Sequence, residues 1–120
     1  MRDADLRDRT KAFALRVVRL ASALPKELAA QVLGKQVLRS GTSVAANFRE
    51  ATRARSDAEF IAKLGIVEQE LDETLLWLEI LVDSKILPEA KLASLKQEAD
   101  ELLSITITII RNTKAKKRKS

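Results

Sequence analysis

The sequence predicts an all-α protein, an up-down-up-down antiparallel four-helix bundle. Its 120 residues include only three glycines and two prolines, too few for the many turns of a β protein. Hydrophobic residues make up 46% of the chain and aromatic residues only 3%, so we expect a core of leucine, isoleucine, valine and alanine. Apolar residues recur every three or four positions in four segments, the spacing that lines one face of a helix.

The first two helices are separated by Pro25. The first carries a stripe of core positions at alternating spacings of four and three: Leu6, Thr10, Phe13, Val17, Leu20 and Leu24. Pro25 stops this helix and suits the first turn of the next, which we expect to run from about Pro25 to Arg53. Gly34 and Gly41 lie inside this second helix. Each costs about 1 kcal/mol relative to alanine, so we expect both to serve close packing.

The third helix is predicted to begin with a capping box. In this motif Ser56 accepts a hydrogen bond from the Glu59 amide, and the Glu59 side chain reaches back to Ser56. Its core positions follow: Phe60, Leu64, Val67, Leu71, Thr74, Leu78 and Leu81. Pro88 starts the fourth helix. The stretch Ser104–Ile110 alternates like a β strand, but a lone strand would have no partner, so we predict helix there as well.

Short connections make consecutive helices antiparallel neighbours. We expect residues 1–112 to form the bundle and residues 113–120 to be a flexible basic tail. The N-terminus is too charged for a signal peptide, and no segment approaches the roughly 20 apolar residues of a membrane span. We therefore expect a cytoplasmic protein with no membrane partner.

Charge is segregated along the chain. Residues 1–55 hold 12 basic and 5 acidic side chains, whereas residues 56–110 hold 4 basic and 12 acidic ones. Residues 111–120 hold 6 basic side chains and no acidic one, so the net charge of +5 comes from the first half and the tail. A partner with negative charge would therefore bind these two parts of the chain.

The clustered basic residues predict contact with nucleic acid. Arg49, Arg53 and Arg55 end the second helix. The tail adds Arg111, Lys114, Lys116, Lys117, Arg118 and Lys119. Guanidinium and ammonium groups neutralise phosphates, so we expect these residues to bind the backbone of RNA or DNA. A basic run that only keeps the protein in solution is the alternative. Base-specific reading of single strands is not expected, because aromatic side chains are nearly absent.

A polar seam runs beside the apolar stripes of the second and third helices. We define it by Gln36, Arg39, Ser43, Asn47, Glu50, Glu70, Glu73 and Trp77. Buried acids are costly unless paired, so we expect Glu70 and Glu73 to pair with Arg39 or with the hydrogen-bonding side chains of the second helix. Trp77 is expected to be a core or interface anchor. The seam either fixes helix register within one bundle or lies between subunits.

No catalytic, metal-binding or cofactor-binding residue is expected. A di-iron site in a bundle needs Glu-x-x-His motifs, and the chain has no histidine. There is also no cysteine, and Ser40 and Ser43 lack a histidine base. The glycine pair lacks the ending of a phosphate-binding loop. We therefore predict that the protein is not an enzyme.

Three stretches carry a resemblance to a known family. They are FALRVVRLASALP (Phe13–Pro25), VLRSGTSVAANFREATRARSDAEFIAKL (Val37–Leu64) and EQELDETLLWLEIL (Glu68–Leu81). In motif order and over roughly residues 5–112 the chain resembles the four-helix-bundle proteins of the 23S rRNA-intervening sequence family. The resemblance implies a bundle that assembles as a ring, typically a homopentamer, with no established enzymatic activity. A related accessory protein of diversity-generating retroelements works with nucleic acid and a reverse transcriptase.

Charge and resemblance together predict a non-enzymatic, homo-oligomeric bundle, a pentamer by resemblance, that binds structured RNA or DNA through backbone phosphates. The alternative is a protein-interaction scaffold that presents a ring surface to a partner protein and has no nucleic-acid role. Salt separates the two, because phosphate binding weakens steeply as salt rises.

Overall fold

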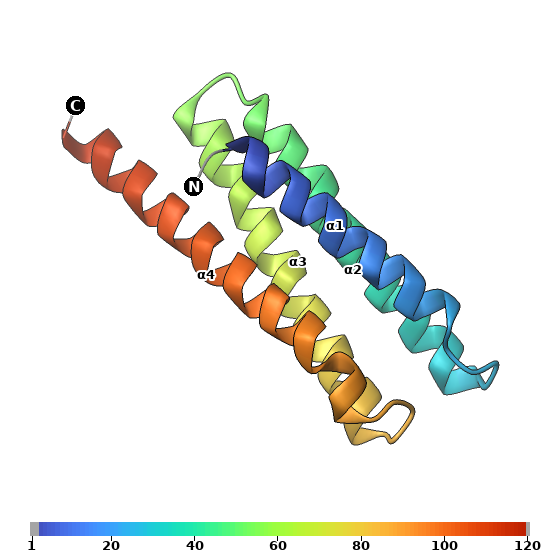
Figure 1. Cartoon of the computed structure of the whole chain (residues 1–120). Coiled ribbons are helices and arrows are strands. Elements are labelled where there is room, and N and C mark those ends of the chain that lie inside the picture. The colour runs from blue at the N-terminus through green and yellow to red at the C-terminus, as the bar shows by residue number, and fades with distance from the viewer. Residues whose placement is uncertain (1–2, 120) are drawn as a thin grey trace.

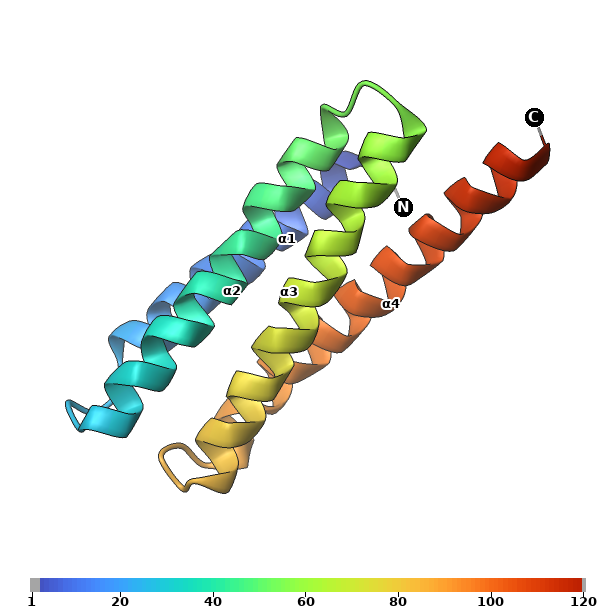
Figure 2. The same cartoon turned by 180° about the vertical axis from the view of Figure 1, so that it is seen from behind.

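The computed structural model describes residues 3–119 and contains four α helices joined by short connections (Figure 1). They are α1 (Asp3–Ser22), α2 (Leu28–Thr52), α3 (Asp57–Asp83) and α4 (Glu89–Lys119). No strand occurs within the described range. Consecutive helices run antiparallel, α2 packs on α1 and α3, and α3 packs on α4 (Figure 2). The predicted all-α, up-down-up-down bundle is confirmed.

The core is aliphatic and lies between the facing stripes of the helices. Val17 of α1, Val44 of α2 and Leu71 of α3 are fully buried, and Leu102 of α4 is nearly so. Burying a valine or leucine side chain contributes about 1.5–3 kcal/mol, so these stripes supply the main driving force for folding. The stripes expected from periodicity are the ones that point inward.

Glycine allows α1 and α2 to approach closely. A Cβ atom added to Gly41 would lie 2.7 Å from Val17 Cγ1, closer than real Cβ atoms come to any neighbour. A Cβ on Gly34 would lie 3.0 Å from Leu24 Cδ1. On Gly65 of α3, by contrast, an added Cβ would meet nothing within 4 Å. The expected packing role is therefore confirmed most clearly at Gly41.

The second helix begins later than predicted, at Leu28 and not at Pro25. Leu24, which precedes Pro25 in the connection between α1 and α2, is buried, with 7% of its surface exposed. The Gln31 side chain donates a hydrogen bond to the Pro25 carbonyl oxygen at 2.8 Å, which holds the turn. Pro25 therefore lies in the connection between α1 and α2, and α2 starts three residues after it.

The beginning of α3 shows one half of the predicted capping box, the bond to the Ser56 side chain, whereas the reciprocal bond to the Glu59 side chain does not form among the described residues. Ser56 has extended backbone angles, and its Oγ accepts a hydrogen bond from the Glu59 amide at 3.1 Å. The negative charges of Asp57 and Glu59 in the first turn interact favourably with the positive end of the helix dipole. The connection from Arg53 to this cap is short, so α3 begins close to the end of α2.

We expect Ser56→Ala to lower the free energy of unfolding by about 1 kcal/mol, because one amide of the first turn loses its acceptor. Ser56→Asp should keep most of the stability, since a carboxylate oxygen can accept the same bond. Denaturant unfolding of both variants checks this. Equal stability of the alanine and aspartate variants would contradict the capping role.

The fourth helix includes the stretch that alternates like a strand. Its inward positions recur at helical spacing: Leu92, Leu95, Ala99, Leu102, Thr106 and Ile110. Thr106 and Thr108 donate to carbonyl oxygens four residues earlier, at 2.7 and 2.9 Å, which satisfies their hydroxyl groups inside a helix. The predicted helix at Ser104–Ile110 is confirmed. Burial of apolar side chains at helical spacing outweighs the β propensity of these residues.

The basic tail continues this helix. Residues 113–119, expected to be a flexible tail, form the last turns of α4. The Thr113 hydroxyl donates to the Ile109 carbonyl oxygen at 2.8 Å and so joins the first of these turns to the preceding turn of α4. The flexibility of this segment stays a prediction. Residues 1–2 and 120, the outer ends of the two expected regions, lie outside the described residues.

Polar contacts join α1 to α4. Arg9 pairs with Glu98 and, at 3.5 Å, with Glu101, and Arg16 donates to Ser94 at 2.9 Å. Hydrogen bonding to Glu98 raises the pKa of Arg9 above its ordinary value. These contacts lie along the first half of α4, and they leave its second half free to follow another direction.

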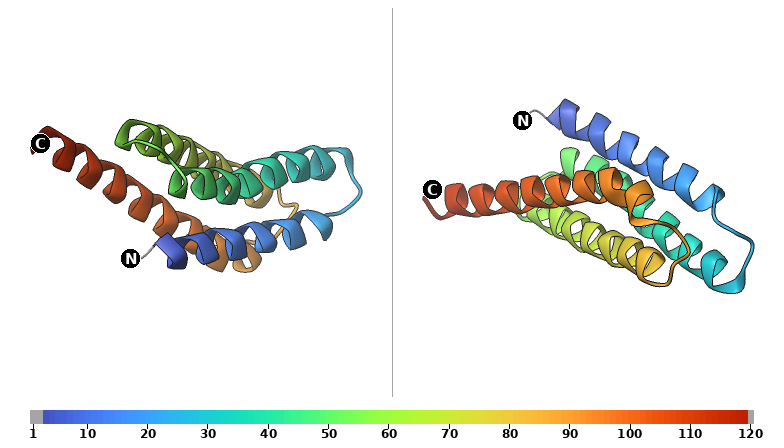
Figure 3. Two further views of the ribbon diagram at one scale, coloured as in Figure 1. Left: turned by 90° about the horizontal axis from the view of Figure 1, so that it is seen from above. Right: turned by 60° about the horizontal axis from the view of Figure 1, so that its bottom comes forward.

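The up-down topology brings three chain segments to one end of the bundle. The start of α1, the α2–α3 connection and the end of α4 share this end, which we call the α2–α3 end (Figure 1). The last turns of α4 diverge there from the other three helices (Figure 3). The basic cluster at the end of α2 and the basic end of α4 thereby lie at the same end of the bundle.

Candidate nucleic-acid interface

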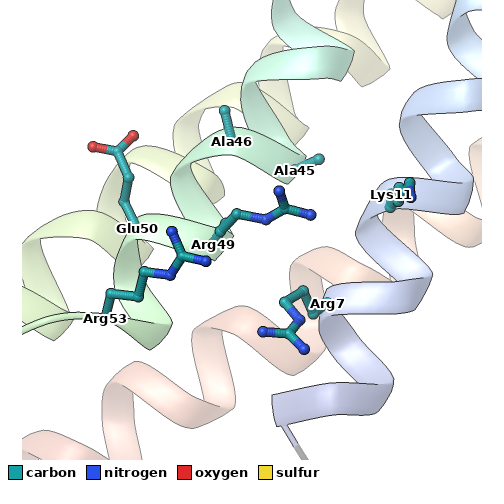
Figure 4. A pocket seen from close by; sticks show the side chains of 7 residues that line it. All are labelled: Arg7, Lys11, Ala45, Ala46, Arg49, Glu50 and Arg53. Carbon is teal, nitrogen blue, oxygen red and sulfur yellow. The ribbon is translucent and has the colours of Figure 1, made fainter.

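A hollow of about 440 Å³ opens between α1 and α2 near the α2–α3 end. We call it the α1/α2 hollow. It is lined by Arg7, Lys11, Ala45, Ala46, Arg49, Glu50 and Arg53 (Figure 4). Four of these seven side chains are cationic and exposed to solvent. The hollow is therefore a concave surface of positive charge.

Helical spacing explains how the cations converge. Arg49 and Arg53 are four residues apart on α2, and Arg7 and Lys11 are four residues apart on α1, so each pair shares a helix face. The small side chain of Ala45 lies between the pairs and keeps the hollow open. Antiparallel packing places the start of α1 beside the end of α2, and the two pairs then face one space.

The one acid that lines this hollow is engaged elsewhere. Glu50 Oε1 accepts from Lys63 Nζ of α3 at 3.0 Å, which offsets its charge. Among the described side chains, none forms an ion pair with Arg7, Lys11, Arg49 or Arg53. Among the side chains that the structure describes, no ion pair thus offsets the positive charge that faces the α1/α2 hollow, and this charge can attract an anion.

A second hollow, of about 710 Å³, lies between the start of α3 and the end of α4. We call it the α3/α4 hollow. It is lined by Ala58, Ile61, Lys114, Lys117 and Arg118. Its floor is apolar, and its cations come from the segment that was expected to be a tail. The helical form of this segment holds Lys114 and Arg118, four residues apart, on one face.

The structure thus brings together part of the predicted interface. Arg49 and Arg53 share the first hollow, and Lys114, Lys117 and Arg118 share the second. Arg55 is exposed in the α2–α3 connection between them. The remaining predicted cations line neither hollow and project from the end of α4: Arg111, Lys116 and Lys119.

Sequence reasoning missed Arg7 and Lys11 as interface residues. Both belong to the polar side of α1, where basic residues are common and carry no distinguishing motif. Their four-residue spacing was visible in the sequence. Their position opposite Arg49 and Arg53 depends on which helix packs against α1 and in which register, and that is a property of the tertiary structure.

The polar seam forms on the outer side of the α2–α3 contact. The Arg39 guanidinium donates from Nη1 to Glu70 Oε2 at 2.9 Å and from Nη2 to Glu73 Oε1 at 3.0 Å. The expected pairing of these acids with Arg39 is confirmed. The Arg39 side chain is 52% exposed and that of Glu70 only 11%, so the seam is open to solvent at Arg39 and largely buried at Glu70.

Four other members of the seam take no part in the Arg39 ion pairs. Asn47 donates to the Ser43 hydroxyl at 2.8 Å and to its carbonyl oxygen, so this pair acts within α2. Gln36 is partly buried. The Trp77 indole N–H is buried without a hydrogen-bond partner among the described residues. The role of these residues in assembly stays a prediction.

A buried hydroxyl pair joins α2 to α3 behind the seam. Ser40 Oγ and Thr74 Oγ1 are hydrogen-bonded at 2.8 Å, and both residues are fully buried. Sequence reasoning placed Thr74 in the core but did not pair it with Ser40. The pair satisfies two polar groups in an otherwise aliphatic layer and thereby favours one register of α2 against α3.

Neither a metal cluster nor a membrane span occurs in the described part of the chain. Within residues 3–119, no group of three or more histidine, cysteine, aspartate or glutamate side chains is placed to hold a metal ion. No helix in this range is both long enough and apolar enough to cross a membrane.

The family is decided by comparison with known proteins. Residues 2–108 match the family described as 23S rRNA-intervening sequence protein. The chain belongs to this family. The resemblance found in its motifs is confirmed.

A solved structure supports the same assignment. A protein of unknown function from the S23 ribosomal protein family of Bacteroides thetaiotaomicron is 40% identical in sequence, with a TM-score of 0.86. The match covers 92% of this chain and 99% of that one. No curated protein gives a significant match. The 23S rRNA-intervening sequence family is thus shown, and it is not a known enzyme family.

Proposed function

We propose that this family member is a non-enzymatic, cytoplasmic homo-oligomer, a pentamer by family resemblance, that binds structured RNA or DNA through backbone phosphates. The α1/α2 hollow is the observation that carries the proposal. Arg7, Lys11, Arg49 and Arg53 surround one concave space, and the neighbouring Glu50 is paired with Lys63. Such a surface attracts phosphate by charge and by guanidinium hydrogen bonds.

The expected binding mode is tolerant of sequence. Phosphate contacts release condensed counterions, so the logarithm of the binding constant falls by about 0.9 per contact for each tenfold rise in salt. The aromatic side chains that could stack on bases are largely occupied: Phe13 and Phe48 are buried in the core, and Phe60 and Trp77 are partly buried. Shape and backbone charge would therefore guide the choice of target more than base identity.

Oligomerisation would strengthen weak contacts. Each additional subunit presents its own hollow and its own basic helix end to the same nucleic acid. Linked sites raise overall affinity by about 10²–10⁴ when a ligand can engage them together. A ring of modest individual sites can thus hold a folded RNA firmly at moderate salt.

We expect the charge-reversal variant Arg49→Glu/Arg53→Glu to bind a labelled rRNA-like hairpin about 100-fold more weakly than the unchanged protein. Each reversal replaces an attraction of about 0.7 kcal/mol, that of two unit charges about 6 Å apart in water, by a comparable repulsion, so the two reversals together cost about 2.8 kcal/mol. Two lost phosphate contacts should also reduce the slope of log affinity against log salt by about 2. Fluorescence anisotropy across a salt series measures both quantities.

The matched control is Lys26→Glu/Lys91→Glu, which makes the same change in net charge at the opposite end of the bundle. Both lysines are exposed, and neither lines a hollow described above. This control should change affinity less than about threefold, and circular dichroism melts should show all variants folded. Equal losses for the two variants would mean that net charge alone, and not the α1/α2 hollow, attracts the RNA. No binding by any form would favour the scaffold alternative.

A further inference from the structure

The two hollows lie on either side of the α2–α3 connection. Arg53 lines the α1/α2 hollow, and Ala58, five residues later, lines the α3/α4 hollow. Five residues span at most about 18 Å, since an extended chain advances by at most about 3.6 Å per residue. Arg55 is exposed midway along this connection. Arg55 therefore places one positive charge between the two hollows at the α2–α3 end.

The α3/α4 hollow differs from the first in having an apolar floor. Ala58 and Ile61 form this floor, and Lys114 and Arg118 stand on its α4 side. The last turns of α4, which carry these cations, diverge from the other helices (Figure 3), and the hollow lies between them and the start of α3. A sugar or base can rest on the floor while the neighbouring phosphates meet the cations.

Acidic residues stand beside the same route. Asp57 and Glu59 are exposed in the first turn of α3 and would repel phosphates there. The attraction must then come from Arg55 before this turn and from Lys114 and Arg118 beyond it. A strand would follow the α4 side of the hollow, past Ala58, and would avoid the acids.

We propose that the two hollows and Arg55 form one continuous track that takes a single strand of RNA or DNA by its phosphodiester backbone. The inference rests on the proposed function and adds the class of ligand and its path. Phosphates of one strand in a stacked helix advance by about 3.4 Å along the axis. The backbone from Arg53 to Ala58, which line the two hollows, spans at most about 18 Å, so at most about five such phosphates lie between these two residues.

Strand length tests the track. The probes are labelled oligo(U) of three and of twelve nucleotides, and the proteins are the full chain, Arg49→Glu/Arg53→Glu, Lys114→Glu/Arg118→Glu and the combined variant. The trinucleotide can occupy one hollow, whereas the dodecanucleotide can reach both. We expect the full chain to bind the longer probe about 100-fold more tightly, because the second contact becomes intramolecular.

The proposal predicts that the loss of affinity caused by each double reversal depends on the length of the probe. Either double reversal should remove most of the about 100-fold advantage of the longer probe, while it changes trinucleotide binding only about twofold. The combined variant should lose binding of both probes. Lys26→Glu/Lys91→Glu again serves as the control, with both affinities and their ratio unchanged.

Different results overturn different statements. Equal fold-losses for the two probe lengths would show independent sites; the track would fail while phosphate binding stands. No loss in any variant would remove the proposed function itself. Co-expressing the two double-reversal chains gives a final check. Recovery of tight dodecanucleotide binding in such mixed oligomers would show that the strand bridges neighbouring subunits, which would overturn a track within one chain.

Discussion

Gly41→Ala is expected to lower the free energy of unfolding by about 1–2 kcal/mol, although alanine is a better helix former than glycine by about 1 kcal/mol. The new Cβ would lie 2.7 Å from Val17 Cγ1 and 2.8 Å from Cγ2. Val17 is fully buried and β-branched, so its stiff side chain cannot rotate away. The helices would have to move apart, and such overpacking costs about 1–3 kcal/mol, here about 2–3 because the three nearest atoms all lie within 3.0 Å.

Two other glycines provide matched controls for this substitution. Gly65→Ala meets nothing within 4 Å and should raise stability by about 1 kcal/mol through helix propensity alone. Gly34→Ala should fall between the two, because it meets only the far end of the flexible Leu24 side chain at 3.0 Å. Denaturant unfolding of the three variants gives the order directly.

A second-site change sharpens the test. In the Gly41→Ala background, Val17→Ala removes the two methyl groups that clash, so it should cost less than the same change in the unaltered chain. A Gly41→Ala protein that equals the Gly65→Ala protein in stability would show that α1 and α2 do not meet tightly at this point.

Arg39→Ala is expected to lower the free energy of unfolding by about 2 kcal/mol. It removes the partner of Glu70, whose side chain is only 11% exposed, and a mostly buried carboxylate without its partner is costly. Glu73→Ala should cost less than about 1 kcal/mol, because Glu73 and Arg39 are 43% and 52% exposed and water screens their attraction.

A double-mutant cycle separates the charge from the packing. In a Glu70→Gln background, Arg39→Ala should cost less than about 0.5 kcal/mol, because no buried charge is left unpaired. Arg39→Lys should recover only part of the loss, since one ammonium group cannot reproduce a fork that reaches both acids. Equal losses in the free energy of unfolding for Arg39→Ala and Glu73→Ala would contradict the burial of Glu70 away from water.

Helix position and burial were largely predictable from the sequence. Phe13, Val44, Leu71 and Leu102 recur at helical spacing with their neighbours, and all of them face the core. The start of α2 differs from the prediction by three residues, because Pro25 lies in the connection and not in the first turn of the helix. The family could also be recognised from its motifs, and the comparison over residues 2–108 confirms it.

The candidate site was predictable only in part. Arg49 and Arg53 are adjacent on one helix face, so their clustering follows from a spacing of four residues. Arg7 and Lys11 complete the same hollow from a distant part of the sequence, and no motif marks them. The Ser40–Thr74 hydrogen bond was missed for the same reason.

The sequence by itself determined four helices, their inward faces and the family of the chain, because helical periodicity is a local property that each segment carries in its own spacing. The tertiary structure decided which faces meet. The contact of Gly41 with Val17 sets how closely α2 approaches α1, and with it the distance between two pairs of cations. The register between packed helices depends on how distant side chains interlock, and periodicity along one segment does not contain that information.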